Sequence, residues 1–520
     1  MSEIAICFII LGAAVVLFVW NRLPVEVVAL GVALSLWATG LLTIHESLAG
    51  LGDTTVVFIA TLFVVSEALD ATGVTAWAGQ QVTRWASSER RVLVMIMVIC
   101  ALLTTMITPN GSVAAMVPMV VVLAIRMKQP TSQYLLPLAF AAHAGSLLTL
   151  TGSPVNVLVS EATDDAGLGK IGFFTFALLG IPLLVGTVVI AVLLGGRLLP
   201  HRSGKAISTS LGEHAKVLGR HYRLEHAEEL VSKEEGLAEV VVPPRSDIIG
   251  EVVYPGMITD SGDLQIVAVQ RKGEDLGPGE ATLAAGDVLL VQGSWADLEY
   301  QIAADPNVMA VDAPADIRRQ AVPLGPGSTK ALVILGAMVV LLATGLLPPV
   351  VAGLLAAIAM VLAGVLPLKA AYRSVSWTTV ILVGGMIPLS HAMQSTGAAA
   401  KLADGLMTVV GDSSPYLLAL GLFVLTAVLG QLISNTATAL ILIPVAITAA
   451  RDLGASPKPM LLVVCVAAAA SLLTPVATPA NMMVKDPGGY EFGEYWKLGL
   501  PILVWYGVVA IGIVPLIWSF

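Results

Sequence analysis

Two polar clusters interrupt apolar stretches of this chain, and they match one another across its two halves. The first cluster contains Asn110, Ser146, Thr149, Pro154 and Asn156. Each recurs at a constant offset in the second half, as Asn435, Ser471, Thr474, Pro479 and Asn481. Polar side chains are costly inside a membrane unless they have partners or a function. Paired interruptions of apolar segments, one in each half, are typical of the binding site of a membrane transporter.

The composition excludes an ordinary soluble protein. Of the 520 residues, 57% are hydrophobic and 12% are charged, whereas soluble domains have about 25% charged residues. Apolar runs long enough to cross a bilayer recur towards both ends of the chain. The formal net charge of -9 argues against nucleic acid as a partner. We therefore expect a multi-pass protein of the plasma (cell inner) membrane, surrounded by lipid.

The pattern predicts an α-helical polytopic membrane protein built from inverted repeats. The first membrane half is expected at 1–199, with a repeat over about 24–160. The second half is expected at 331–520, with a repeat over about 348–485. Together the two halves are expected to contain ten spans.

The polar motifs define two kinds of interruption in these halves. The stretches 91–128 and 415–451 are each divided by an Asn motif and are expected to form re-entrant hairpins. The spans near 134–160 and 459–485 hold the other motifs and are expected to be broken helices. Non-helical backbone at membrane depth is tolerated only where it lines a cavity or is buried in protein.

Basic residues predict the orientation. Cations such as Arg90, Arg197, Lys205 and Arg373 fall on one side if both hairpins are re-entrant, and this side is expected to be cytoplasmic. The first repeat then begins inside and the second begins outside, so the hairpins enter from opposite faces. Such an inverted pair is what alternating access around a central site requires.

The region between the two membrane halves changes character. We predict a linker helix at 200–237, a small soluble α+β domain at 238–305 and a return linker at 306–330. Short apolar runs separated by Gly- and Asp-rich turns predict the strands. The predicted strands are 238–243, 246–250, 264–269 and 286–291, with a closing helix at 297–304. The basic-residue pattern places this domain in the cytoplasm.

The residue types of the paired motifs suit two kinds of ligand. Asn, Ser and Thr stand beside Gly and Pro, which leave backbone carbonyls and amides free. Carbonyl and hydroxyl oxygens suit Na⁺, and helix N-termini suit an anion. Neither motif contains a carboxylate, so sodium coupling is more natural than proton coupling. The alternative is helix packing through small residues, which does not require matched Asn, Pro and Ser or Thr. His143, one turn before Ser146, is interpreted as a core histidine rather than a proton relay.

Two motifs of the second half resemble signatures of the divalent-anion/sodium symporter family, which transports citrate, dicarboxylates and sulfate. They are Ser434-Asn435-Thr436 and Ala477-Thr478-Pro479-Ala480-Asn481. The first half departs from the family, because Pro109-Asn110-Gly111 stands where Ser-Asn-Thr is usual. The resemblance implies a dimeric secondary active transporter, not an enzyme. It implies symport of a small divalent anion with Na⁺ by an elevator-like movement.

The resemblance leaves the substrate open between sulfate and a C4-dicarboxylate or citrate type. A proton-coupled or exchange-mode anion transporter of the same fold is the alternative. The implied anion-binding residues are Pro109, Asn110, Gly111, Ser153, Pro154, Ser434, Asn435, Thr436, Thr478 and Pro479. The implied sodium ligands are Thr105, Asn110 and Gly152 in one site and Gly430, Ile433, Asn435 and Ala477 in the other.

The soluble region resembles the C-terminal module of potassium-channel regulatory subunits (TrkA-C, also called RCK-C). The resemblance rests on the segments 244–250 and 283–293. Such modules often dimerise and bind small ligands, in some cases cyclic dinucleotides. The resemblance therefore implies a small regulatory ligand on this domain.

Overall fold

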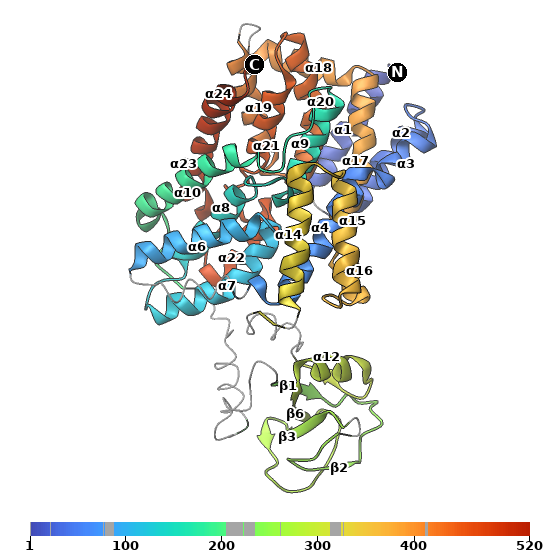
Figure 1. Ribbon diagram of the computed structural model, residues 1–520, viewed down its shortest axis with the longest axis vertical. Helices are drawn as coiled ribbons and strands as arrows, with labels where there is room; N and C mark the ends of the chain where they lie inside the picture. The colour runs from blue at the N-terminus through green and yellow to red at the C-terminus, as the bar shows by residue number, and fades with distance from the viewer. Residues whose placement is uncertain are drawn as a thin grey trace. The chain divides into compact units, whose positions relative to one another are not determined.

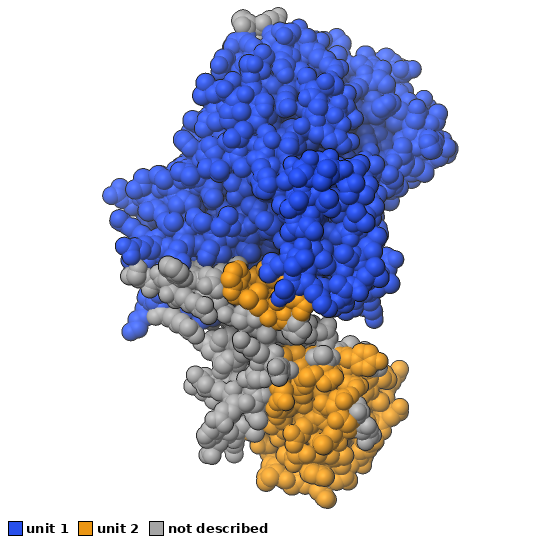
Figure 2. All heavy atoms as spheres, in the orientation of Figure 1, with its two compact units in different colours: residues 1–69, 81–206, 329–520 blue, residues 70–80, 207–328 orange. Residues whose placement is uncertain are grey.

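The computed structural model describes residues 2–20, 22–75, 77, 88–203, 222, 235–259, 262–311, 324–325, 327–410 and 414–520. Contacts divide the chain into two compact units (Figure 2). Unit 1 comprises residues 1–69, 81–206 and 329–520, and unit 2 comprises residues 70–80 and 207–328. The expected linker helix at 200–237 lies largely outside the described residues. The sequence did not predict the grouping of 70–80 with the soluble segment, where Gly325 N donates to the Thr72 carbonyl at 2.9 Å.

Unit 1 is helical in both of its halves. The first half contains α1 (Glu3–Trp20), α2 (Val25–Ala38), α3 (Ile44–Ala49), α4 (Thr54–Ala71), α6 (Glu89–Thr104), α7 (Pro109–Arg126), α8 (Ser132–Gly145), α9 (Pro154–Asp165) and α10 (Ala177–Leu198). The second half contains α14 (Ser328–Thr344), α15 (Pro349–Leu362), α16 (Leu368–Ser374), α17 (Trp377–Ser395), α18 (Ala398–Val410), α19 (Pro415–Leu429), α20 (Asn435–Asp452), α21 (Pro457–Ala468), α22 (Pro479–Gly488), α23 (Tyr495–Val508) and α24 (Val514–Ile517).

Fewer uninterrupted spans are present than the ten we expected. Within the described ranges, four helical stretches are long and apolar enough to cross a membrane. They are Glu3–Trp20, Ile44–Ala71, Ala177–Leu198 and Phe492–Ile517. The pair α16 and α17, bent by 54°, is a fifth candidate. The difference has two causes. The polar motifs divide two of the expected spans, since the run 134–160 becomes α8 and α9 and the run 459–485 becomes α21 and α22. The expected spans 24–43, 331–346 and 348–364 form the apolar helices α2, α14 and α15, which have only 14, 17 and 14 residues.

The helices around the polar motifs pack across the two halves. Helix α9 of the first half contacts α20 and α21, and α22 of the second half contacts α7 and α8. Figure 1 shows α6 and α7 towards the lower end of unit 1 and α19 and α20 towards its upper end. The last segment of each broken helix therefore lies against the Asn-bearing helix of the other half.

Glycines bring two long helices against the non-helical breaks, which lie between α8 and α9 and between α21 and α22. A Cβ at Gly180 in α10 would lie 2.4 Å from the Leu147 carbonyl oxygen, and one at Gly499 in α23 would lie 2.2 Å from that of Leu472. Real Cβ atoms do not approach backbone oxygens so closely. Both breaks are thus held in place by a helix backbone that only glycine permits.

The soluble part of unit 2 is an antiparallel sheet with strand order β4-β3-β6-β1-β7. Its elements are β1 (Glu235–Val241), β3 (Leu264–Arg271), β4 (Glu274–Asp275), β6 (Val288–Ser294), β7 (Met309–Ala310) and the helix α12 (Trp295–Ala304). A separate pair joins β2 (Val252–Val253) to β5 (Ala281–Thr282). Trp295 and Leu298 of α12 pack on one face of the sheet, and Tyr222 packs on the other.

Two details of this domain correct the sequence prediction. The segment 246–250 forms turns and not a strand. The reason is a contact distant in sequence: Ser246 Oγ donates to the Asn307 carbonyl at 2.8 Å, and Asp247 N donates to Asn307 Oδ1 at 2.9 Å. The sheet also extends beyond 305, because β7, which pairs with β1, lies within the predicted return linker 306–330.

An ion pair between the buried Asp287 carboxylate and the partly exposed Arg271 holds the β3–β6 side of the sheet, and its pH dependence is predictable. Arg271 donates to both oxygens of Asp287, at 2.8 and 2.7 Å, while Ala284 N donates to Oδ2 at 2.8 Å. These bonds hold the pKa of the Asp287 carboxyl below its usual range. Their stabilising contribution is therefore present above the unfolded pKa of about 3.9 and is lost as the pH falls through the folded value.

We expect Asp287→Asn to destabilise this domain by a few °C at pH 7. The difference from the wild type should shrink as the pH falls from about 5 to below the folded pKa, because the carboxyl of the unfolded state binds its proton first and that of the folded state last. Hydrogen exchange of β3 and β6 in the full chain measures the effect. A difference that stays constant over this range would contradict the assigned ionisation.

Candidate functional site

Four helices begin at the predicted anion-binding residues, and each begins with a capping hydroxyl. The cap satisfies one amide of the first turn, and the remaining free amides favour negative charge. The caps are Thr108 of α7 (from Gly111 N, 3.4 Å), Ser153 of α9 (from Val155 N, 3.2 Å), Ser434 of α20 (from Ala437 N, 3.3 Å) and Thr478 of α22 (from Asn481 N, 3.3 Å). The Thr-Pro, Ser-Pro and Ser-Asn pairs explain these starts, since Pro is favoured at the first helical position.

The predicted anion-binding residues differ in exposure. Thr478 is buried, and Ser434 and Pro479 are exposed. The others are half-buried, namely Pro109, Asn110, Gly111, Ser153, Pro154, Asn435 and Thr436. Most of these residues are therefore accessible at the helix starts rather than enclosed in the core.

Asn110 joins the start of α7 to the start of α22. Its Oδ1 accepts a hydrogen bond from Ala480 N at 3.1 Å, although Ala480 belongs to the other half. The predicted groups Pro109-Asn110-Gly111 and Thr478-Pro479 are thereby brought together. The Asn110 amide nitrogen is a donor, so two helix starts and one amide donor share this place.

Asn435 lies in a different set of contacts. Ser471 Oγ is within hydrogen-bond distance of both Asn435 Oδ1 and the Gly430 carbonyl oxygen, the latter at 3.0 Å. Two of the predicted sodium ligands of the second half therefore meet at Ser471. Ile433 and Ala477 are buried, but no hydrogen bond between described residues joins either of them to Asn435.

The predicted sodium ligands of the first half are arranged differently. The Thr105 carbonyl accepts from Thr149 Oγ1 at 2.8 Å and from Thr151 Oγ1 at 3.1 Å. Gly152 lies against Ser146, whose carbonyl oxygen would be 2.4 Å from an added Cβ. Asn110 has no hydrogen bond to Thr105 or Gly152 in the described part of the chain, and it bonds the other half instead.

Two further asparagines, which sequence reasoning noted in the repeat but did not place in the site, hold the breaks. Asn156 Nδ2 donates to the carbonyls of Ser146 and Thr149, at 2.7 and 2.8 Å. Asn481 Nδ2 donates to the carbonyls of Ser471 and Thr474, at 2.8 and 3.0 Å. Both side chains are 0% exposed. Each amide thus replaces backbone bonds lost where the helix stops.

His143 is another residue that the sequence analysis did not assign to the site. Its Nε2 lies 3.1 Å from Asn481 Oδ1 and 3.2 Å from Thr478 Oγ1. Because both Asn481 Nδ2 hydrogens go to carbonyls, its Oδ1 faces the ring as an acceptor. His143 must then carry a hydrogen on Nε2. Thr478 Oγ1 already accepts from Asn481 N, so its own hydrogen remains available to an anion.

We expect His143→Leu to weaken anion binding while the protein still folds. Removing the donor leaves Asn481 Oδ1 buried without its partner, at a cost of about 1–3 kcal/mol. The anion KM should rise by about tenfold. His143→Gln, which offers an amide N–H near the same place, should restore most of the loss. Equal KM values for the Leu and Gln variants would contradict a role in orienting Thr478.

Apolar helices interrupted at capped, partly accessible polar starts are the architecture of a multi-pass membrane transporter. The sequence model of the citrate transporter family (CitMHS) matches residues 15–439 and 407–520. The chain belongs to this family.

Relatives of this chain are also transporters. The chain is 29% identical to the uncharacterized transporter YfbS of Escherichia coli, over 98% of both proteins. It is 27% identical to sodium/sulfate cotransporter 2 of Chlamydomonas reinhardtii, over 53% of this chain and 32% of that protein. Among solved structures, the YdaH transporter of Alcanivorax borkumensis covers 98% of this chain and 99% of its own, with a TM-score of 0.49 and 16% identity.

Proposed function

We propose that this transporter carries a small divalent anion together with Na⁺, by alternating access between two inverted repeats. Sulfate is the first candidate and a C4-dicarboxylate or citrate the second. The observation that carries the proposal is the junction at Asn110 and Ala480, where helix starts from both halves meet. The sodium/sulfate cotransporters among the relatives support sulfate, and the family description supports citrate.

Electrostatics favour an anion at this junction. Helix N-termini carry partial positive charge, equivalent to roughly half an elementary charge each. The Thr478 hydroxyl and the Asn110 amide add donors that need no counter-charge. A divalent anion is therefore bound by dipoles alone, which hold it less tightly than arginines would and permit its release.

Sodium is the coupling ion that the oxygens near both breaks suit. The Gly430 carbonyl and Asn435 Oδ1 converge at Ser471, while the Thr105 carbonyl is surrounded by the hydroxyls of Thr149 and Thr151. Hydroxyl, amide and carbonyl oxygens are ligands for hard cations. Proton coupling is the alternative, and the one observation in its favour is the titratable ring of His143 beside Thr478.

The crossed packing of α9 and α22 supports the conformational part of the proposal. Each lies on helices of the other half, so the two repeats enclose one region between them. In this scheme α6–α7 and α19–α20 are re-entrant hairpins entering from opposite faces, and the chain forms a homodimer. The soluble domain is a cytoplasmic, TrkA-C-like module.

Uptake into proteoliposomes tests the proposal. Labelled sulfate, succinate and citrate are compared under an inward Na⁺ gradient, an inward proton gradient and no gradient. We expect one of these anions, sulfate first, to accumulate only with Na⁺. Accumulation driven by protons alone, and lost in His143→Gln, would favour the alternative. Failure of all three anions would contradict the substrate class.

A further inference from the structure

The soluble domain contains a cavity that the transport mechanism does not use. Its volume is about 160 Å³. The walls are formed by the sheet, by the two loops on either side of β2 and by the end of α12. A cavity of about 150 Å³ in a protein interior holds a molecule the size of benzene. The space therefore fits a small molecule and not a dinucleotide.

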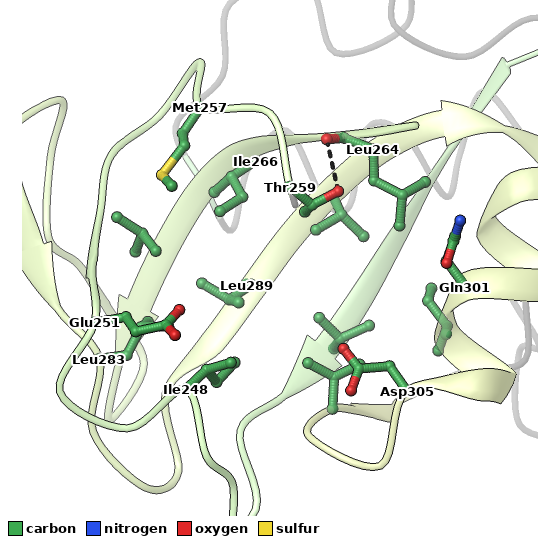
Figure 3. A pocket seen from close by; sticks show the side chains of 15 residues that line it. Ile248, Glu251, Met257, Thr259, Leu264, Ile266, Leu283, Leu289, Gln301 and Asp305 are labelled. Atoms are coloured by element: carbon green, nitrogen blue, oxygen red, sulfur yellow. Dashed lines mark hydrogen bonds between the residues drawn. The ribbon is translucent and has the colours of Figure 1, made fainter. Parts of the chain in front are cut away.

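The floor of the cavity is apolar. Leu289 lies near its centre in Figure 3, with Ile248, Leu283, Met257 and Ile266 around it. Apolar side chains left without a partner forfeit packing energy, because a void offers no atoms on one side. An apolar body that fills the space restores these contacts, which favours occupancy.

The polar groups of the cavity are acidic or neutral. Figure 3 shows the carboxylates of Glu251 and Asp305 on opposite sides of Ile248 and Leu289. Gln301 and Thr259 complete the polar lining, and the residues that line the cavity include no Lys, Arg or His. Within the described part of the chain, neither Glu251 nor Asp305 forms a salt bridge. The charge of the site thus suits a cation and disfavours a phosphate.

We propose that this cavity binds a small amphipathic cation, with an apolar body over Ile248 and Leu289 and an ammonium group between Glu251 and Asp305. The assignment differs from the cyclic dinucleotides that some TrkA-C-like modules bind, because two phosphates would face two carboxylates. It does not depend on the proposed transport function, since all the lining residues belong to unit 2.

The test uses three probes of one shape: benzylamine, benzyl alcohol and benzoate. Binding to the full-length protein is followed by hydrogen exchange in β3, β6 and α12, with unit 1 as an internal control. We expect benzylamine to bind about tenfold more tightly than benzyl alcohol, and benzoate more weakly than both. The advantage of the amine should fall as salt is added, as for a pair of exposed charges.

Two variants make the test specific. Glu251→Gln combined with Asp305→Asn should abolish the preference for the amine and leave alcohol binding unchanged. Val291→Phe, which fills the cavity, should abolish binding of all probes. The proposal is overturned if benzoate binds as well as benzylamine, if the preference survives neutralisation, or if no probe protects the domain. It is also overturned if Val291→Phe only dissociates a dimer, because a second copy would then be the occupant.

Discussion

Asn435→Ala and Asn110→Ala should each reduce sodium-driven uptake by at least about 100-fold. Asn435 Oδ1 meets Ser471 Oγ beside the Gly430 carbonyl, and Asn110 Oδ1 accepts from Ala480 N. Each substitution removes a side-chain oxygen from a proposed binding site. Asn110→Ala also leaves Ala480 N without its side-chain acceptor, at a cost of about 1–3 kcal/mol, whereas Ser471 Oγ keeps the Gly430 carbonyl in Asn435→Ala. Because the anion and cation sites are thermodynamically linked, weaker binding at one site also weakens binding at the other, and the effect on uptake is larger than the effect on either site alone.

A matched control separates function from folding. Ser35→Ala in α2 removes a hydroxyl that bonds only within its helix, to the Gly31 carbonyl at 2.6 Å, and should transport normally. Both Asn variants should keep melting temperatures within a few °C of the wild type. The two Asn variants should also differ from each other. Asn435→Ala should weaken the affinity for Na⁺ more than the affinity for the anion, and Asn110→Ala should do the reverse. Normal uptake in either Asn variant would refute the site.

Gly499→Ala should have a large effect on folding. The new Cβ would lie 2.2 Å from the Leu472 carbonyl oxygen, so α23 must move away from the break between α21 and α22. Overpacking of this kind typically costs about 1–3 kcal/mol, and more where backbone must shift. We expect lower expression, a lower melting temperature and loss of transport. Gly180→Ala, against Leu147, should act in the same way at the first break.

Matched glycines control for helix propensity. Gly196 in α10 and Gly512 in the π-helical turn Val509–Ile513 have nothing within 4 Å of an added Cβ. Alanine should be neutral at both positions, and slightly stabilising at Gly196, because glycine is the poorer α-helix former by about 1 kcal/mol. Thermal melting of the purified proteins compares the two variants at the breaks, Gly499→Ala and Gly180→Ala, with the two control variants. If Gly499→Ala were as stable as Gly512→Ala, the close approach of α23 to the break would be wrong.

The helix starts at the polar motifs follow from local chemistry, because a capping residue acts on its neighbours in the chain. Thr108-Pro109, Ser153-Pro154 and Thr478-Pro479 each contain a cap followed by a favourable first residue. The repeat likewise drew attention to Asn156 and Asn481. What these starts and amides bond to depends on folding, and no local pattern contains that information.

The missed features all involve partners distant in the chain. His143 forms a hydrogen bond with Asn481, 338 residues away. Its position one turn before Ser146 therefore gave no sign of this contact. In the soluble domain, the apolar pair Ile248-Ile249 suggested a strand at 246–250. Asn307, about 60 residues on, instead holds that segment in turns. Tertiary hydrogen bonds overrode local propensity in both places.

Uphill transport tests the central claim most directly. Proteoliposomes are loaded with the same concentration of labelled sulfate inside and outside, and an inward Na⁺ gradient is then imposed without a proton gradient. The account predicts net accumulation inside for the wild type and for Ser35→Ala, and none for Asn435→Ala. Succinate and citrate are tested in parallel under the same gradient. The account is contradicted if no anion accumulates in the wild type, or if accumulation is unchanged when choline replaces Na⁺.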